Sequence, residues 1–240
     1  MRASSFEIDR NHVRESRAHA AAREPRVAEF DVPGDRSPVP GPDAQSRASA
    51  LCAGATIPSG HSVHVDAEAF VRTPEIADAQ QIARTMNDSW RVGYRGLLSD
   101  AILDGLDDAR GTTQWVQWLR HGYENAGLRA EFRVTTDAAR QIVGVSAFGG
   151  DRDLPNDANR GEVWTLYVAP SHWGRGFGYA LLHDAEEALA ATGRRDLALW
   201  VLEGNDRARR FYERAGWRDD NGMKPFGDSG LYEVRYRKQV

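Results

Sequence analysis

The sequence predicts an α/β protein, in which a mixed central sheet carries helices on both of its faces. Three observations predict this fold class. The segment 178–192 repeats apolar residues at helical spacing, and the segment 196–202 is almost continuously apolar, as in a central strand. Strand-like and helical segments also follow one another in the order β-α-α-β-β-β-α-β-α-β. Apolar residues make up 41% of the chain, which is enough to bury a core between such layers.

The composition excludes several classes of function. No stretch approaches the roughly 18 consecutive apolar residues of a membrane-spanning helix, so we expect no membrane partner. The formal net charge of −4 provides no general attraction to nucleic acid or to anionic lipid, so we expect no nucleic-acid partner. Cys52 is the only cysteine, which excludes an internal disulfide. We therefore expect a cytoplasmic protein, and a homodimer remains open.

The first 66 residues differ in composition from the rest. Arg, Asp and Glu are mixed there with Ala, Ser, Pro and Gly, and neither the helical nor the strand period persists. Such a segment buries too little apolar area to offset its chain entropy. We expect residues 1–66 to be a disordered or low-order extension and residues 67–240 to form one domain; a functional arm, or an upstream region from a misplaced start codon, is the alternative for the extension. His61 and His64 have no neighbouring residues at ligand spacing, so we expect no metal site.

The first part of the domain is predicted to be mainly helical. After a short strand, Thr73 is expected to be the N-cap of a helix, with Pro74 in its first turn. An aromatic loop follows this helix. The expected strand is 70–72, the aromatic loop is 90–98, and two further helices are expected at about 99–106 and 112–121.

The second part of the domain contains most of the predicted strands. The segment 137–139 reads as the turn of a hairpin, and 149–160 reads as a polar loop. Gly193 and Gly216 close two helices, and Asn205 caps the second of them. The expected strands are 131–136, 141–148, 162–168, 196–202 and 231–236, and the expected helices are 178–192 and 205–215.

A glycine-rich turn joins the strand 162–168 to the helix 178–192. Its residues are Trp173, Gly174, Arg175, Gly176, Phe177 and Gly178. Glycines at alternate positions let the backbone adopt unusual torsions and approach a ligand closely. The helix that follows offers free N–H groups and the positive end of its dipole. Together these features predict an anion site suited to a diphosphate.

Other glycine-rich motifs do not match this turn. The dinucleotide fingerprint G-x-G-x-x-G requires a glycine where Tyr179 stands. The nucleotide loop G-x-x-x-x-G-K-S/T requires a lysine, and none lies near the turn. A turn with a purely structural role is the alternative that the residues leave open.

The turn and its flanks resemble a known family. The segment 173–178 is similar to the acetyl-CoA loop R/Q-x-x-G-x-G/A of the GNAT acetyltransferases, except that Trp173 replaces the usual Arg or Gln. The preceding Leu-Tyr-Val-Ala-Pro, the following Ala-Leu-Leu and a second block at 205–217 also resemble that family. The two blocks lie one βα unit apart, and the resemblance covers about residues 69–240. The departure at Trp173 concerns one side-chain contact and leaves the backbone cradle in place.

The resemblance implies a GNAT acyl-CoA N-acyltransferase fold with acetyl-CoA as co-substrate. In this family two parallel strands diverge after a bulge, and pantetheine lies between them like an extra strand. By resemblance the N–H of Leu166 faces the acetyl oxygen and Val168 pairs with pantetheine, although ordinary ladder positions are the alternative for both. The residues that the resemblance assigns to cofactor binding are Leu166, Tyr167, Val168, Trp173, Gly174, Arg175, Gly176, Phe177, Gly178, Tyr179 and Asn205.

The resemblance also suggests two catalytic residues. Tyr212 lies on the helix that faces the thiol in this family, and its phenol is our candidate general acid for the departing thiolate; packing beside Phe211 is the alternative. Glu162 begins the strand that leads to the glycine turn, at the spacing where histone-type members carry a catalytic carboxylate. It is our candidate general base, and an exposed carboxylate at a strand end is the alternative.

The sequence therefore predicts an N-acetyltransferase that moves an acetyl group from acetyl-CoA to a primary amine by direct attack in a ternary complex. A non-catalytic module that binds acyl-CoA as a sensor is the alternative. The acceptor is a small-molecule amine or a protein amino group, and we expect the loops at 90–98 and 149–160 and the segment 221–230 to select it. Asp151, Asp153, Asp157 and Asp228 are candidates to attract a cationic amine, and a solvated acidic loop is the alternative.

Overall fold

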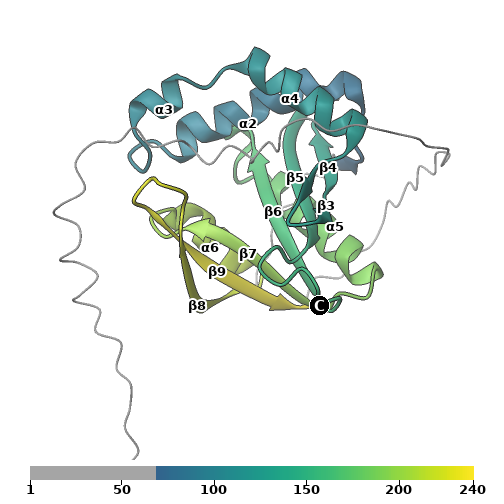
Figure 1. The fold of residues 1–240 in the computed structure, drawn as a ribbon. Helices are drawn as coiled ribbons and strands as arrows, with labels where there is room; N and C mark the ends of the chain where they lie inside the picture. The colour runs from purple at the N-terminus through teal and green to yellow at the C-terminus, as the bar shows by residue number, and fades with distance from the viewer. Residues whose placement is uncertain (1–68) are drawn as a thin grey trace, which may run out of the picture.

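Seven strands form one sheet at the centre of the domain (Figure 1). The computed structural model describes residues 69–240, so the extension predicted at 1–66 lies outside the described residues. The strands lie in the order β1-β4-β5-β6-β7-β9-β8, and within this sheet β6 and β7 are parallel whereas the other neighbours are antiparallel. The strands are β1 (Phe70–Arg72), β4 (Glu131–Thr136), β5 (Ile142–Gly150), β6 (Arg160–Val168), β7 (Asp196–Leu202), β8 (Arg218–Pro225) and β9 (Tyr232–Gln239).

Helices cover both faces of the sheet, which confirms the predicted fold class. On one face, α2 and α4 bury Ile82 and Trp115 against β4, β5 and β6. On the other face, α5 and α6 bury Leu182 and Tyr212 against β7 and β9. The described helices are α2 (Ala79–Gly93), α3 (Asp100–Asp104), α4 (Asp108–His121), α5 (Phe177–Ala191) and α6 (Asp206–Arg214), and a small hairpin of β2 (Glu124–Asn125) and β3 (Leu128–Arg129) follows α4.

The start of the first helix differs from the prediction. Thr73 does not cap it; a 3-10 turn at Ile76–Asp78 comes first, and α2 begins at Ala79. The Asp78 carboxylate accepts the Glu75 N–H at 2.7 Å and binds the Arg72 guanidinium at 2.6 Å. Arg72 pulls the pKa of Asp78 below its usual value, so the carboxylate is charged and ties β1 to this turn.

Other elements also differ from the prediction. α2 extends to Gly93, so the first residues of the predicted loop at 90–98 are helical. α4 begins at Asp108 because Asp107 caps it, accepting the N–H of Ala109 at 2.7 Å. The strand β8 was not predicted, because its sequence is polar and most of its residues are exposed or half-buried at the edge of the sheet.

The sheet opens between its two parallel strands. β6 and β7 pair from Arg160 opposite Asp196 to Val163 opposite Leu199, and neither strand pairs with the other beyond that point. The register of β6 against β5 shifts at the same place, where Ala147 faces Thr165 and Phe148 faces Val163, so Trp164 is an extra residue in the strand. An extra residue bends the strand that carries it. The divergence of these strands after a bulge, which the resemblance implied, is therefore present.

Candidate active site

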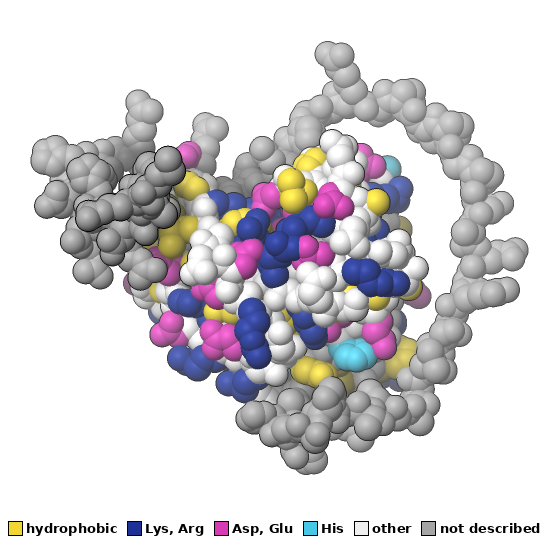
Figure 2. All heavy atoms as spheres, turned by 90° about the horizontal axis from the view of Figure 1, so that it is seen from below, with side chains coloured by type: hydrophobic (Ala, Val, Ile, Leu, Met, Phe, Trp, Pro, Cys, Tyr) yellow, Lys and Arg dark blue, Asp and Glu magenta, His cyan; other side chains and the backbone are white. Residues whose placement is uncertain are grey.

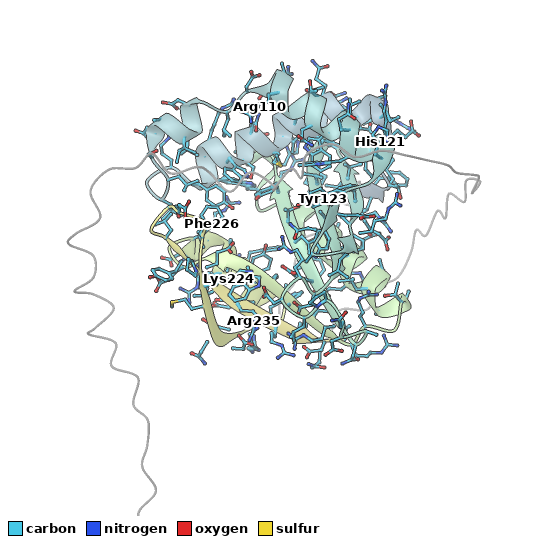
Figure 3. The ribbon with its side chains drawn as sticks, in the orientation of Figure 1. Arg110, His121, Tyr123, Lys224, Phe226 and Arg235 are labelled. Atoms are coloured by element: carbon cyan, nitrogen blue, oxygen red, sulfur yellow. The ribbon has the colours of Figure 1, made fainter. Side chains whose placement is uncertain are left out.

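The opening between β6 and β7 is part of a cavity of about 980 Å³. Both diverging strand ends line it, together with the end of α2, the glycine turn, the start of α5 and one side of α6. Tyr123 lies on one side of the space between the ribbons, whereas Lys224 and Phe226 lie on the other side, on β8 and just after it (Figure 3). A cavity of this size is typical of sites for small molecules and cofactors.

The glycine turn takes the backbone conformation that its sequence requires. Gly174 and Gly176 have φ angles of 76° and 91°, which residues with a side chain rarely adopt. The first bond of α5 runs from the Ala180 N–H to the Gly176 carbonyl at 2.9 Å. The N–H groups of the preceding turn of the helix have no helical carbonyl to bind, and they lie beside the cavity lined by Gly176, Gly178 and Tyr179. This arrangement is an anion site of the predicted kind.

Trp173 has a different role from the Arg or Gln that it replaces. Its indole N–H donates to the Val168 carbonyl at 2.6 Å and so ties the turn to the end of β6. The guanidinium of Arg207, from the first turn of α6, lies 3.1 Å from the centroid of the Trp173 ring. Partial burial of the guanidinium lowers the pKa of Arg207 to about 10, so it is still cationic at neutral pH. Arg207 lines the cavity and forms no ion pair within residues 69–240.

Tyr212 and Asn205 reach the cavity from α6. Tyr212 is 8% exposed, and burial raises its pKa above the usual value, so its phenol keeps the proton. Its hydroxyl forms no hydrogen bond within the described part of the chain, whereas its ring packs against Phe211. The Asn205 side-chain carbonyl accepts the Ala208 N–H at 3.1 Å as the N-cap of α6. Its amide N–H₂ group is left for a ligand.

Glu162 lies in a different environment from the one we expected. The residue is 0% exposed and is not in the lining of the cavity. The Arg152 side chain donates to both carboxylate oxygens, at 2.5 and 3.0 Å, and the Arg152 backbone N–H donates to one of them at 2.9 Å. This geometry makes Glu162 a residue that positions Arg152, which does line the cavity.

Glu233, on β9, lines the cavity and was not singled out from the sequence. Burial raises the pKa of Glu233, although the nearby Lys224 and Arg152 oppose this shift. A carboxylate that alternates with apolar residues near the end of a strand carries no motif.

The other predicted cofactor residues divide into two groups. Leu166, Tyr167 and Val168 line the opening from β6, but the Tyr167 ring packs 6.1 Å from Trp90 of α2. The side chains of Arg175 and Phe177 do not line the cavity. Phe177 is 1% exposed and anchors the start of α5 in the core, and Arg175 stacks on it from outside. Arg175 and Phe177 can therefore contribute only backbone groups to the cavity.

The predicted acidic loop is largely neutralised by arginine and lysine. Asp151 binds Arg160 at 2.8 Å, and Asp153 binds the Trp200 indole N–H at 2.9 Å and Lys224 at 3.4 Å. One surface of the molecule likewise shows basic and acidic side chains interleaved (Figure 2). These two aspartates therefore hold the loop in place, and no three His, Cys, Asp or Glu side chains gather as metal ligands within residues 69–240.

Solved structures with the same fold are N-acetyltransferases. The PaiA N-acetyltransferase from Thermoplasma acidophilum, solved in complex with coenzyme A, has a TM-score of 0.55 at 18% identity, over 72% of this chain and 99% of that chain. A GCN5-related N-acetyltransferase from Kribbella flavida has a TM-score of 0.53 at 21% identity, over 72% and 98%. The fold is therefore that of the GNAT acetyltransferases.

The sequence comparisons agree with the fold. Residues 103–217 match the model of the acetyltransferase (GNAT) family. A probable N-acetyltransferase of Mycobacterium tuberculosis is 26% identical over 70% of this chain and 91% of its own length. A spermidine N(1)-acetyltransferase of Thermoplasma acidophilum is 24% identical over 62% and 87%. The chain thus carries a GNAT acetyltransferase domain and is an N-acetyltransferase.

No helix in the described residues combines the length and apolar composition needed to cross a bilayer.

Proposed function

We propose that the protein transfers the acetyl group of acetyl-CoA to a primary amine by direct attack in a ternary complex. The observation that carries this proposal is the continuity of one cavity from the glycine turn into the opening between β6 and β7. The same cavity therefore contains an anion site for the diphosphate and, next to it, two unpaired strand edges for the pantetheine arm. A continuous cavity also lets the acceptor meet the thioester without a covalent enzyme intermediate.

The residues present fit coenzyme A. The first-turn N–H groups of α5 and the guanidinium of Arg207 are donors for phosphate oxygens, and Arg207 supplies the positive charge that Trp173 lacks. The diverging end of β6 would hold the pantetheine arm at Val168, and the free amide N–H₂ group of Asn205 is a donor for one of its carbonyls. The glycines at 174, 176 and 178 let the phosphates approach the backbone.

The transfer needs little chemistry from side chains once the two substrates are aligned. The acceptor reacts as a neutral amine, because an alkylammonium group with a pKa of about 10 has no free electron pair at neutral pH. Attack forms the N–C bond, and charge develops on the acetyl oxygen, which the N–H of Leu166 would stabilise. The C–S bond then breaks. Tyr212 would donate its proton to the departing thiolate and recover one from the nitrogen.

The acceptor is an amine, either a small molecule or an amino group of a protein. The spermidine acetyltransferase among the relatives supports the first alternative. The aromatic side chains that line the cavity, including Trp164 and Trp200, provide an apolar wall for the carbon skeleton of such an acceptor. The loop that carries Asp153 contributes Arg152 to the lining of the cavity, and the β8–β9 hairpin contributes Lys224, Phe226 and Gly227.

A two-stage measurement tests the function. Calorimetric titration of the purified protein with CoA should show binding, and a thiol reagent should detect free CoA when acetyl-CoA and a panel of primary amines are added. Binding without amine-dependent release of CoA would identify a sensing module instead of an enzyme. Absence of CoA binding would eliminate both functions.

A further inference from the structure

Glu233 lies beside the opening, on the face of the sheet opposite to the glycine turn. It faces Leu202 of β7 and Lys224 of β8 in the strand register. Its neighbour Val234 points to the other face, into the core under α5 and α6. Because successive side chains of a strand alternate between faces, Glu233 projects away from the helices that form the predicted phosphate site.

Glu233 is the only carboxylate among the described residues that line the cavity. The charged side chains around it are already compensated in pairs. Arg152 binds Glu162 at 2.5 Å, Lys224 binds Asp153 at 3.4 Å, and Arg235 binds Asp220 at 2.9 Å. The Glu233 carboxylate itself forms no hydrogen bond or ion pair within residues 69–240. It therefore adds one carboxylate without a bonded partner to this part of the cavity.

The walls around this charge are mostly aromatic. Trp200 lies on the same face, two residues before Leu202, and its indole is held by Asp153 at 2.9 Å. Trp164 and Tyr123 contribute rings 6.0 Å apart, and Phe226 lines the cavity from the end of β8. Tyr123 and Phe226 approach the cavity from opposite sides (Figure 3). A single carboxylate among aromatic walls has the chemistry to bind a cation on an apolar skeleton.

We propose that Glu233 binds the ammonium group of the acceptor, and that the acceptor is a primary amine on an alkyl or arylalkyl skeleton without a carboxylate next to the nitrogen. This inference rests on the proposed function and specifies its acceptor. A carboxylate beside the amine would be repelled by Glu233, because the three neighbouring cations are already paired. The partly buried position of Glu233 strengthens its attraction for a cation. The bound ammonium gives its proton to the Glu233 carboxylate, and the neutral amine then attacks the thioester from the face opposite to the phosphates.

The test compares Glu233→Gln with Glu203→Gln. Glu203 is an exposed carboxylate in the turn after β7 and does not line this cavity, so its variant is the matched control. Release of CoA is measured for the full chain with spermidine, phenethylamine and L-phenylalanine, the last two differing by one carboxylate. CoA affinity is measured in parallel by calorimetry.

Wild-type protein is expected to use phenethylamine or spermidine at least tenfold more efficiently, in kcat/KM, than L-phenylalanine. Glu233→Gln should lower kcat/KM for the amines at least tenfold and should narrow the preference over L-phenylalanine, with CoA affinity unchanged. Glu203→Gln should behave as wild type. Unchanged kinetics in Glu233→Gln, or a wild-type preference for L-phenylalanine, would overturn the role of Glu233 alone. Failure of wild-type protein to bind CoA or to use any of the three acceptors would overturn the proposed function as well.

Discussion

Tyr212 combines burial with an unused hydroxyl group, which is unusual for a tyrosine in a core. Its ring packs in the cluster under α5 and α6, and the residue lines the cavity. Because burial raises its pKa, the phenol keeps its proton in the resting enzyme. It is therefore available to donate a hydrogen bond to a thiolate. We predict that Tyr212→Phe lowers kcat about 100-fold while the affinity for CoA is unchanged.

The control for this variant is Tyr236→Phe. Tyr236 is a buried tyrosine of the same cluster, but its hydroxyl binds Glu213 at 2.8 Å and it does not line the cavity. Steady-state release of CoA should therefore be near wild type in Tyr236→Phe, whereas its thermal stability should fall. Full turnover by Tyr212→Phe would remove the general acid from the mechanism.

Arg207 is expected to supply the charge that the family motif places at the position of Trp173. A charged hydrogen bond to phosphate contributes about 1.5–3 kcal/mol. Arg207→Gln should therefore raise KM for acetyl-CoA about 10- to 100-fold with little change in kcat. Arg210→Gln, which changes an exposed arginine of the same helix outside the cavity, is the control. Equal KM values for the two variants would show that Arg207 does not contact the phosphates.

The roles of single residues could be predicted only where a short sequence motif includes them. The glycines at 174 and 176 and the cap at Asn205 follow from short motifs, and the structure has both features. The environment of Glu162 depends on Arg152, ten residues away in a loop, and no local pattern shows that pair. Arg207 and Glu233 likewise acquire their positions from contacts between distant segments, the first with Trp173 and the second with the opening.

Elements were predicted best where hydrophobic periodicity and end signals agreed. The strand at Asp196–Leu202 and the strand at Glu131–Thr136 have the predicted bounds, because each is an apolar or alternating run between polar ends. The strand β8 was missed because it pairs only with β9, at the edge of the sheet, and has no apolar face to reveal it. The bend of β6 depends on its register against β5, which the sequence of β6 alone does not specify.

The glycine turn allows a test at the scale of an element. Gly174 and Gly193 both have positive φ angles, 76° and 92°, and at both positions an added methyl group would meet no atom within 4 Å. Alanine at either position should therefore cost about 1–2 kcal/mol of unfolding free energy, from backbone strain alone. Only Gly174 lies at the predicted phosphate site, because Gly193 follows the far end of α5.

We predict that Gly174→Ala weakens CoA binding at least tenfold, whereas Gly193→Ala binds CoA as wild type does. Chemical denaturation establishes that the two variants lose similar stability, and calorimetry measures their CoA affinity. A similar CoA affinity in both would mean that the backbone of the turn has only a structural role, which is the alternative that the sequence leaves open.

On the scale of the whole molecule, hydrogen bonds and ion pairs surround the opening in the sheet. They join segments that are distant in the sequence. Trp173 ties the glycine turn to the end of β6, and Asp153 ties the loop after β5 to β7 and β8. Arg152 and Glu162 fasten the same loop to β6, next to the bulge at Trp164. The cavity walls therefore depend on ion pairs and hydrogen bonds that only the assembled sheet brings together.

The buried ion pair of Arg152 and Glu162 makes the last prediction one of stability. Removing one partner of such a pair leaves the other charge uncompensated, so Glu162→Gln should lower the free energy of unfolding by about 3 kcal/mol. Urea denaturation measures this loss. Arg152→Gln combined with Glu162→Gln should lose less than the sum of the two single variants, because the double variant leaves no unpaired charge. If instead Glu162→Gln kept wild-type stability and lost the transfer of acetyl groups, Glu162 would be the general base first inferred from the sequence, and Arg152 would have to release it during turnover.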